Sequence, residues 1–278
     1  MPALQVHRRH RYHRYRIVPA TASQGARSAQ SPVRDHRGSK MHKPVLGVLG
    51  GVGPLATAYF MELVIKKTPA GRDQDNIPMI VFNDPQIPDR TAFILDRTQP
   101  DPLPEMERVV LWLENAGADY IAIPCNTAHF FYEQINAAAR VPVLNIMRET
   151  TSRIVETYGE HATIGLLATD GTLASGVFQS YLSDAGLSVV APHEDDQARI
   201  VMPLIYDCIK RNLPYDPEPF LNLAQRMHDN GCDAVIVGCT ELSVVYQDLA
   251  IKPDYLIDSM DVLADRSVTY YLEHHREA

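Results

Sequence analysis

The sequence of 278 residues has few cysteines and lacks long apolar runs. None of its apolar runs approaches the roughly 18 residues needed to cross a bilayer, so the sequence predicts no membrane-spanning helix. The four cysteines form no CxxC pair, and no secretory signal with an apolar core precedes them. Reduced thiols in a cytoplasmic protein are therefore the expectation.

Acidic residues are almost absent from residues 1–40, which hold nine of the 26 Lys and Arg residues but a single acid, Asp35. Residues 41–278 consequently carry 17 basic and 33 acidic residues, a balance that makes nucleic acid a poor partner. We expect residues 1–43 to form a disordered basic extension that leaves function to the rest of the chain. Three explanations for it compete: a start codon placed upstream of Met41, an organelle transit peptide, and a nucleic-acid-binding arm.

Short apolar runs alternate with helical stretches from residue 45 onward. The runs are residues 45–50, 79–83, 120–124, 141–146, 163–168, 188–192, 234–238 and 255–259. Alternation of this kind is typical of parallel sheets covered by helices. The sequence therefore predicts the α/β class.

Two segments of the chain repeat each other. Asp119 lies six residues before Cys125, Asp233 lies six residues before Cys239, and a threonine closely follows each cysteine. The repeat predicts two pseudo-symmetric α/β domains with a cleft between them. We expect the first domain at residues 44–146, the second at 147–252, and residues 253–278 to return to the first.

The repeated cysteines each follow an apolar run and precede a helical stretch. This places them at the carboxyl edge of a sheet, where open α/β folds bind ligands. A helix N-terminus lowers the pKa of a nearby thiol and attracts a carboxylate, so both thiols are expected to be activated. Two thiols on opposite faces of one carbon suit removal of a proton from one side and its return from the other. The alternatives are inert buried cysteines, a redox disulfide and a zinc site, although no supporting zinc ligands are obvious.

A glycine loop follows the first apolar run. Gly51-Val-Gly53-Pro-Leu-Ala56 fits a dinucleotide-binding fingerprint, but Pro54 interrupts it and no acid lies near the position of the ribose contact. A tight turn whose N–H groups approach an anionic substrate explains the loop equally well.

Six motifs together resemble the aspartate/glutamate racemase superfamily, and most closely its cofactor-independent aspartate racemases. The motifs are LGGVGPLAT (49–57), FNDPQIPDRT (82–91), PCNTAH (124–129), LLATDGT (166–172), GCTEL (238–242) and LIDSMDVLA (256–264). The resemblance covers residues 44 to about 270. Departures are the basic extension and the valine at position 52, where methionine is common in the family.

The resemblance implies an amino acid held between the two domains, a homodimer, and no cofactor. It makes Cys125 and Cys239 the two proton-transfer residues. The substrate-binding residues that it implies are Arg90, Asn126, Thr127, Ala128, Lys210 and Thr240, with Arg90 and Lys210 binding the substrate's side-chain carboxylate. His129 and Glu241 lie one turn from the cysteines, where a helix-start residue and a favourable dipole partner are the simpler interpretations.

The sequence thus predicts a racemase that interconverts L- and D-aspartate with a cysteine on each face of the α-carbon. A superfamily isomerase or decarboxylase acting on maleate, arylmalonates or hydantoins stays open. So does a non-catalytic amino-acid-binding protein, although simple binding has no use for two thiols.

Overall fold

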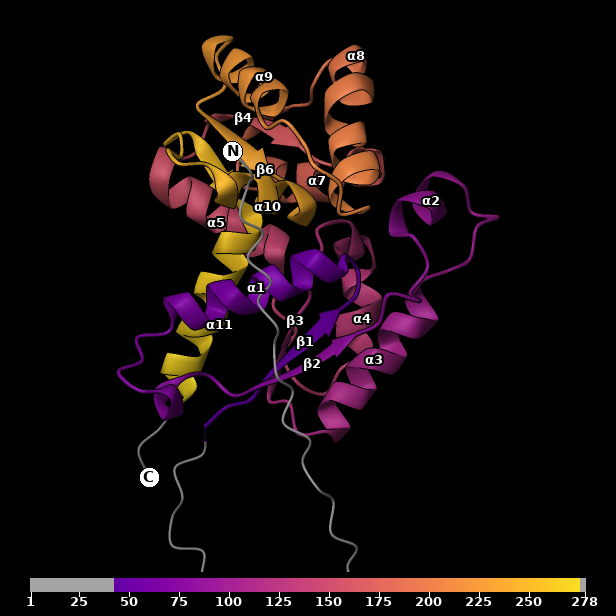
Figure 1. Cartoon of the computed structure of the whole chain (residues 1–278), viewed down its shortest axis with the longest axis vertical. Helices are drawn as coiled ribbons and strands as arrows, with labels where there is room; N and C mark the ends of the chain where they lie inside the picture. The colour runs from indigo at the N-terminus through magenta and orange to yellow at the C-terminus, as the bar shows by residue number, and fades with distance from the viewer. Residues whose placement is uncertain (1–42, 276–278) are drawn as a thin grey trace, which may run out of the picture. The chain divides into compact units, whose positions relative to one another are not determined.

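The computed structural model describes residues 43–275, so the expected basic extension lies outside the described residues. These residues form two parallel sheets with helices packed against them (Figure 1). The first sheet has the order β2-β1-β3, and the second has the order β5-β4-β6-β7. The prediction of the α/β class with two parallel sheets is confirmed.

The strands coincide closely with the apolar runs of the sequence. Their bounds are β1 (Leu46–Gly50), β2 (Met79–Asn83), β3 (Tyr120–Ala122), β4 (Thr163–Leu167), β5 (Ser188–Val190), β6 (Ala234–Val237) and β7 (Leu256–Asp258). β1 and β6 are buried along their whole length, as expected for central strands of parallel sheets.

Helices connect the strands and are numbered along the chain. The α-helices are α1 (Pro54–Lys67), α2 (Arg90–Leu95), α3 (Leu103–Asn115), α4 (Tyr132–Ala138), α5 (Ile146–Tyr158), α6 (Asp170–Ser175), α7 (Val177–Asp184), α8 (Glu194–Asp196), α9 (Glu218–Asp229), α10 (Thr240–Asp248) and α11 (Ser259–His274). Short 3₁₀ helices are η1 (Asp73–Asp75) and η2 (Thr127–Phe131), and π-helical turns are η3 (Gln197–Val201) and η4 (Leu204–Ile209).

The two repeated aspartates form equivalent hydrogen bonds in the two sheets. The carboxylate of Asp119 accepts a hydrogen bond from the Val45 N–H, and that of Asp233 accepts one from the Thr163 N–H. In return each aspartate N–H donates to the carbonyl of the same partner residue. Each aspartate therefore fixes the start of one strand beside another, and the internal repeat of the sequence is a structural repeat.

Two predicted strands differ from the structure. Residues 141–146 form only an isolated bridge between Ile121 and Val143, because Pro142 has no N–H to donate and Asn145 already caps helix α5. The final strand does not return to the first sheet as expected, since β7 pairs with β6 in the second.

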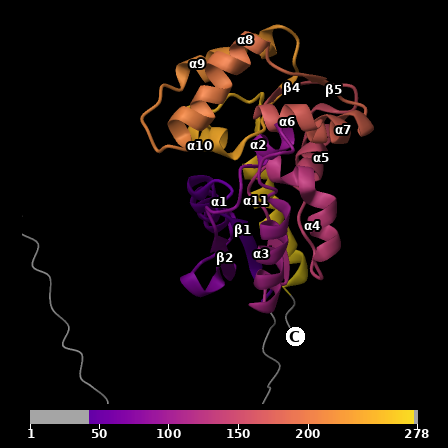
Figure 2. The same cartoon turned by 90° about the vertical axis from the view of Figure 1, so that its right-hand side faces the viewer.

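Helix α11 joins the two halves through their hydrophobic core. It packs beside α1 and α5 (Figures 1 and 2). One buried cluster includes Val48 of the first sheet, Ile164 of the second and Met260 of α11. Two further clusters cover the other face of each sheet, around Val109 and Leu223 respectively. The boundaries at residues 146 and 252 stay a prediction. Among residues 43–275, no helix combines the length and apolarity needed to cross a bilayer.

Asp258, at the start of α11, gives the fold a dependence on pH. Its carboxylate accepts hydrogen bonds from the Met260 N–H and the Ser243 hydroxyl, and burial raises its pKa to about 7. In an unfolded chain this carboxyl ionises near pH 4. Between these two pH values the folded state holds the extra proton, so this residue's contribution to the free energy of unfolding falls as pH rises.

We expect Asp258→Asn to remove that dependence, because the amide keeps the cap acceptor and never ionises. The measurement is chemical unfolding of both proteins at pH 5 and at pH 8. The free energy of unfolding of the variant minus that of the natural protein should be about 2 kcal/mol larger at pH 8 than at pH 5. A stability difference that is the same at both pH values would contradict this assignment.

Candidate active site

The two repeated cysteines lie just beyond the carboxyl ends of strands in different sheets, one after the edge strand β3 and one after the central strand β6. Cys125 follows β3 and precedes the 3₁₀ helix η2, and Cys239 follows β6 and is the N-cap of α10. Both are almost fully buried, with 5% and 4% of their surface exposed. Both line one small cavity to which the two halves of the chain contribute.

Seven of the eight site residues proposed from the sequence line this cavity. They are Cys125, Cys239, Arg90, Asn126, Thr127, Lys210 and Thr240. Ala128 does not line it, because its side chain packs in the core cluster of the first sheet, while its backbone N–H lies against the Cys125 sulfur. The lining also includes Glu241, which the sequence suggested only as a dipole partner, and four residues that sequence reasoning did not single out: Asp89, Thr91, Thr169 and Tyr206.

The cavity is nearly closed. Its volume is about 10 Å³, which is close to the space of one water molecule. An adjoining groove of about 680 Å³ shares Asp89, Arg90, Lys210 and Glu241 with it. These four side chains therefore stand between the thiols and the groove, and a ligand larger than water has to displace some of them to enter.

Burial keeps both thiols neutral. It raises the pKa of Cys125, although Arg90 and the Ala128 N–H act in the opposite direction. It raises the pKa of Cys239 well above the usual range, and the Glu241 carboxylate adds to this by its charge and by a hydrogen bond from the thiol. The expectation that the helix N-termini activate both thiols is thus wrong for this closed state, because loss of water outweighs the helix dipole.

Arg90 is the most deeply buried cation of the site. It begins α2, whose N-cap Asp89 accepts a hydrogen bond from the Ala92 N–H. Only 6% of Arg90 is exposed, and its Nη1 donates to the carbonyls of Ile87 and Pro88. Its Nε is buried with no acceptor among the described residues. The Nε–H of this guanidinium is therefore available to an anionic ligand.

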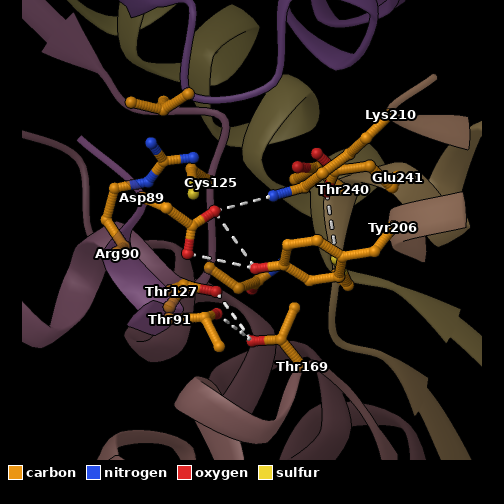
Figure 3. A pocket seen from close by; sticks show the side chains of 13 residues that line it. Asp89, Arg90, Thr91, Cys125, Thr127, Thr169, Tyr206, Lys210, Thr240 and Glu241 are labelled. Carbon is orange, nitrogen blue, oxygen red and sulfur yellow. Dashed lines mark hydrogen bonds and ion pairs between the residues drawn. The ribbon is translucent and has the colours of Figure 1, made fainter. Parts of the chain in front are cut away.

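An ion pair connects the two halves across the mouth of the cavity. Lys210 Nζ lies 3.3 Å from a carboxylate oxygen of Asp89, and the Tyr206 hydroxyl lies 3.2 Å from both oxygens (Figure 3). Burial by itself lowers the pKa of Lys210, but Glu241, Tyr206 and Asp89 together raise it above its ordinary value. Tyr206 lies in the π-helical turn η4 and Lys210 is its C-cap, with the ammonium 4.0 Å from the centre of the Tyr206 ring; π-helical turns are frequent at functional sites.

Hydroxyl groups form the opposite wall of the cavity. The Thr127 hydroxyl lies 3.0 Å from that of Thr169, and the Thr91 hydroxyl donates to that of Thr169 (Figure 3). The Thr127 hydroxyl also lies 2.9 Å from that of Thr172. Thr169 also caps α6 by accepting from the Thr172 N–H. In the internal repeat β4 corresponds to β1, so Thr169, which follows β4, corresponds to the glycine loop that follows β1. This correspondence is the signal in the sequence that could have identified Thr169.

Four polar atoms of the lining are buried without a hydrogen-bond partner among the described residues. They are Arg90 Nε, Asn126 Oδ1, Thr240 Oγ1 and Glu241 Oε1. Buried polar groups in native proteins are nearly always paired, so a cluster of unpaired ones marks the place of a polar ligand. The set offers a cationic donor, two acceptors and a hydroxyl, which match the carboxylate and ammonium groups of an amino acid.

The glycine loop is explained by a carboxylate of the chain itself. Gly51 and Gly53 have φ values of +86° and +125°. A Cβ on Gly51 would lie 2.2 Å from the Asp84 backbone, and one on Gly53 would lie 2.6 Å from Glu241 Oε1. The place beside Gly53 is thus occupied by an acidic side chain, which disfavours a nucleotide phosphate there.

The His129 ring is hydrogen-bonded to backbone groups and has a structural role. Its Nδ1 bonds to the Cys125 carbonyl, its Nε2 accepts from the Ile146 N–H, and burial lowers its pKa to about 4. It does not line the cavity. The interpretation of His129 as a helix-start residue therefore fits the structure, whereas Glu241 is part of the site.

Comparisons with known proteins agree with this geometry. A family model described as Asp/Glu/Hydantoin racemase matches residues 49–266. The broad specificity amino-acid racemase RacX of Bacillus subtilis (strain 168) is 31% identical over 238 residues, which is 83% of this chain and 99% of that protein.

Two solved structures are similar along their whole length. The Picrophilus torridus aspartate racemase has a TM-score of 0.68 and 27% identity, covering 84% of this chain and 100% of its own. An aspartate racemase homologue from Pyrococcus horikoshii OT3 has a TM-score of 0.65 and 20% identity, covering 83% and 100%. At that identity the second likeness concerns the fold alone.

Proposed function

Because the chain belongs to the Asp/Glu/hydantoin racemase family and is an amino-acid racemase, we propose that it interconverts L- and D-aspartate by a two-thiol mechanism. The observation that carries the proposal is the cavity in which two buried thiols from different sheets meet unpaired polar atoms. Arg90 and Lys210 supply positive charge for a substrate with a second carboxylate. The similarity to an aspartate racemase at 27% identity supports the same substrate.

The proposed reaction moves one proton at each face of the α-carbon. One cysteine, as thiolate, takes the α-proton, so that a C–H bond breaks, an S–H bond forms and the electron pair stays on carbon. The other cysteine, as thiol, then gives its proton to the opposite face. Hydrogen bonds to the α-carboxylate from Thr127, Thr240 and the neighbouring N–H groups hold the developing charge in a site that excludes water.

Entry of the substrate requires the site to open. A cavity of about 10 Å³ does not hold an amino acid, and the pair between Lys210 and Asp89 closes its mouth. We infer that the substrate's side-chain carboxylate replaces Asp89 as the partner of Lys210 and supplies the missing partner of Arg90. Closure around the substrate then belongs to the catalytic cycle.

The test is a substrate panel with the purified full chain and no added pyridoxal phosphate. The L-amino acids should include aspartate, glutamate, an amide, a basic and an aliphatic residue, each followed by circular dichroism and by the α-proton NMR signal in D₂O. We expect aspartate to lose both signals together and D-aspartate to accumulate. Equal rates for aliphatic or basic amino acids would instead favour a broad specificity like that of RacX. Maleate, arylmalonates and hydantoins complete the panel, and turnover of these alone would overturn the proposal.

A further inference from the structure

Glu241 stands between one thiol and the groove. The Cys239 thiol donates to Glu241 Oε2 at 3.0 Å, while Oε1 has no hydrogen-bond partner among the described residues. Only 5% of Glu241 is exposed. The residue nevertheless lines both the inner cavity (Figure 3) and the adjoining groove, so it lies between the two spaces.

The charge of Glu241 also acts on the other thiol, that of Cys125, but the hydrogen bond of Glu241 goes to Cys239. Cys125 lies near the Arg90 guanidinium and the Ala128 N–H, and among residues 43–275 no carboxylate is hydrogen-bonded to its sulfur. Like Cys239, it lines the inner cavity but not the groove. His129, one turn away, has both ring nitrogens engaged by backbone groups. The two halves of the repeat therefore place their thiols in unequal surroundings.

We propose that Glu241 is a catalytic residue that transfers protons between Cys239 and solvent, whereas Cys125 has no comparable route. In the forward step the Cys239 S–H bond breaks, an O–H bond forms on Glu241, and the electron pair stays on sulfur. The Glu241 proton then passes to water in the groove. The reverse sequence returns a proton from water through Glu241 to the Cys239 thiolate. The inference rests on the proposed racemase mechanism and names the group that resets one of its two thiols.

The glycine loop and Lys210 support this role. Gly53 leaves room for Glu241 Oε1, because any Cβ at that position would lie 2.6 Å from it. Lys210 lines the same two spaces, and the charge of Glu241 is the largest of the influences that raise the lysine's pKa. The Lys210 ammonium therefore lies beside the carboxylate that receives the thiol proton in the proposed step.

An unequal route to solvent has an isotopic consequence. A deuteron taken from the substrate by Cys239 passes to Glu241 and is lost to water. A deuteron taken by Cys125 leaves the sulfur for solvent more slowly, so a larger share of it returns to carbon when the reaction reverses. In H₂O, the two α-deuterated enantiomers of aspartate should therefore differ in the ratio of deuterium loss to racemisation.

The experiment compares Glu241→Gln with the natural full chain, using L- and D-aspartate deuterated at the α-carbon. We expect kcat to fall about tenfold or more while KM stays within about threefold, since a proton-transfer group is lost and binding groups remain. The enantiomer that loses deuterium faster in the natural enzyme should retain it in the variant, so that both enantiomers behave alike. Glu149→Gln makes the same chemical change at a half-buried glutamate outside the cavity and the groove, and should leave both quantities unchanged.

A second variant separates proton transfer from structure. Glu241→Ala opens space beside Cys239, and formate at millimolar concentration should restore part of its kcat while leaving Glu241→Gln unaffected. Natural enzyme that racemises aspartate with equal deuterium loss from both enantiomers, or Glu241→Gln with unchanged kcat, would overturn the relay and leave the racemase proposal standing. Absence of racemisation in the natural enzyme would overturn both.

Discussion

Cys125→Ser and Cys239→Ser should each lower the rate of aspartate racemisation by at least about a thousandfold. Each substitution removes one of the two sulfur atoms that line the cavity within residues 43–275, while keeping the side chain small, buried and polar. A serine hydroxyl has a far higher pKa than a thiol, so it neither takes the α-proton nor returns it at neutral pH. Circular dichroism at low enzyme concentration and at several aspartate concentrations gives kcat and KM for both directions.

The surviving thiol gives these variants a second readout. In Cys125→Ser, Cys239 and Glu241 are intact, so exchange of the α-proton in D₂O should persist for the one enantiomer that faces Cys239, without formation of its mirror image. Cys208→Ser is the matched control, since Cys208 is partly exposed and lies outside the cavity. Racemisation within tenfold of the natural rate in both cysteine variants would refute the two-thiol mechanism.

Sequence patterning located all seven strands because they lie within nearly continuous apolar runs, although it did not assign every run to the correct sheet. The repeat of Asp119 and Asp233 also predicted where the two halves correspond, and each carboxylate fixes the first strand of its own half. The single bridge at Val143 and the pairing of β7 depend on proline, on capping and on tertiary packing. Those contributions are not encoded in hydrophobic periodicity.

The site was less predictable than the fold because its electrostatics depend on contacts between distant residues. Glu241 looked like a helix-dipole residue until the fold placed its carboxylate against Cys239 and Gly53. Asp89 was read only as part of a motif, yet it pairs with Lys210 from 121 residues away. The pKa values of both thiols are raised, whereas the sequence predicted that they would be lowered. The reason is that burial depends on the assembled cavity and not on the position of a residue at a strand end.

Arg90→Gln should lower kcat/KM for aspartate by about two to three orders of magnitude, because losing one partner of a buried charge pair costs about 2–5 kcal/mol. Glutamine keeps a polar side chain of similar reach at the start of α2 but presents no positive charge to the substrate's second carboxylate. The guanidinium also lowers the pKa of Cys125, so the pH at which the enzyme reaches half of its maximal kcat should shift upward in the variant. Racemisation kinetics between pH 6 and pH 10 measure both effects.

Comparison with a second arginine and a second cation isolates the role of Arg90. Arg97→Gln removes an arginine that packs on Phe93 and Phe130 outside the cavity, and it should leave kcat/KM unchanged. Lys210→Gln should raise KM by a smaller factor, because its ammonium already has Asp89 as a partner and the substrate gains less by replacing it. If instead Arg90→Gln lost activity equally toward aspartate and toward a neutral amino acid, the guanidinium would support the fold of the site and not the recognition of a dicarboxylate.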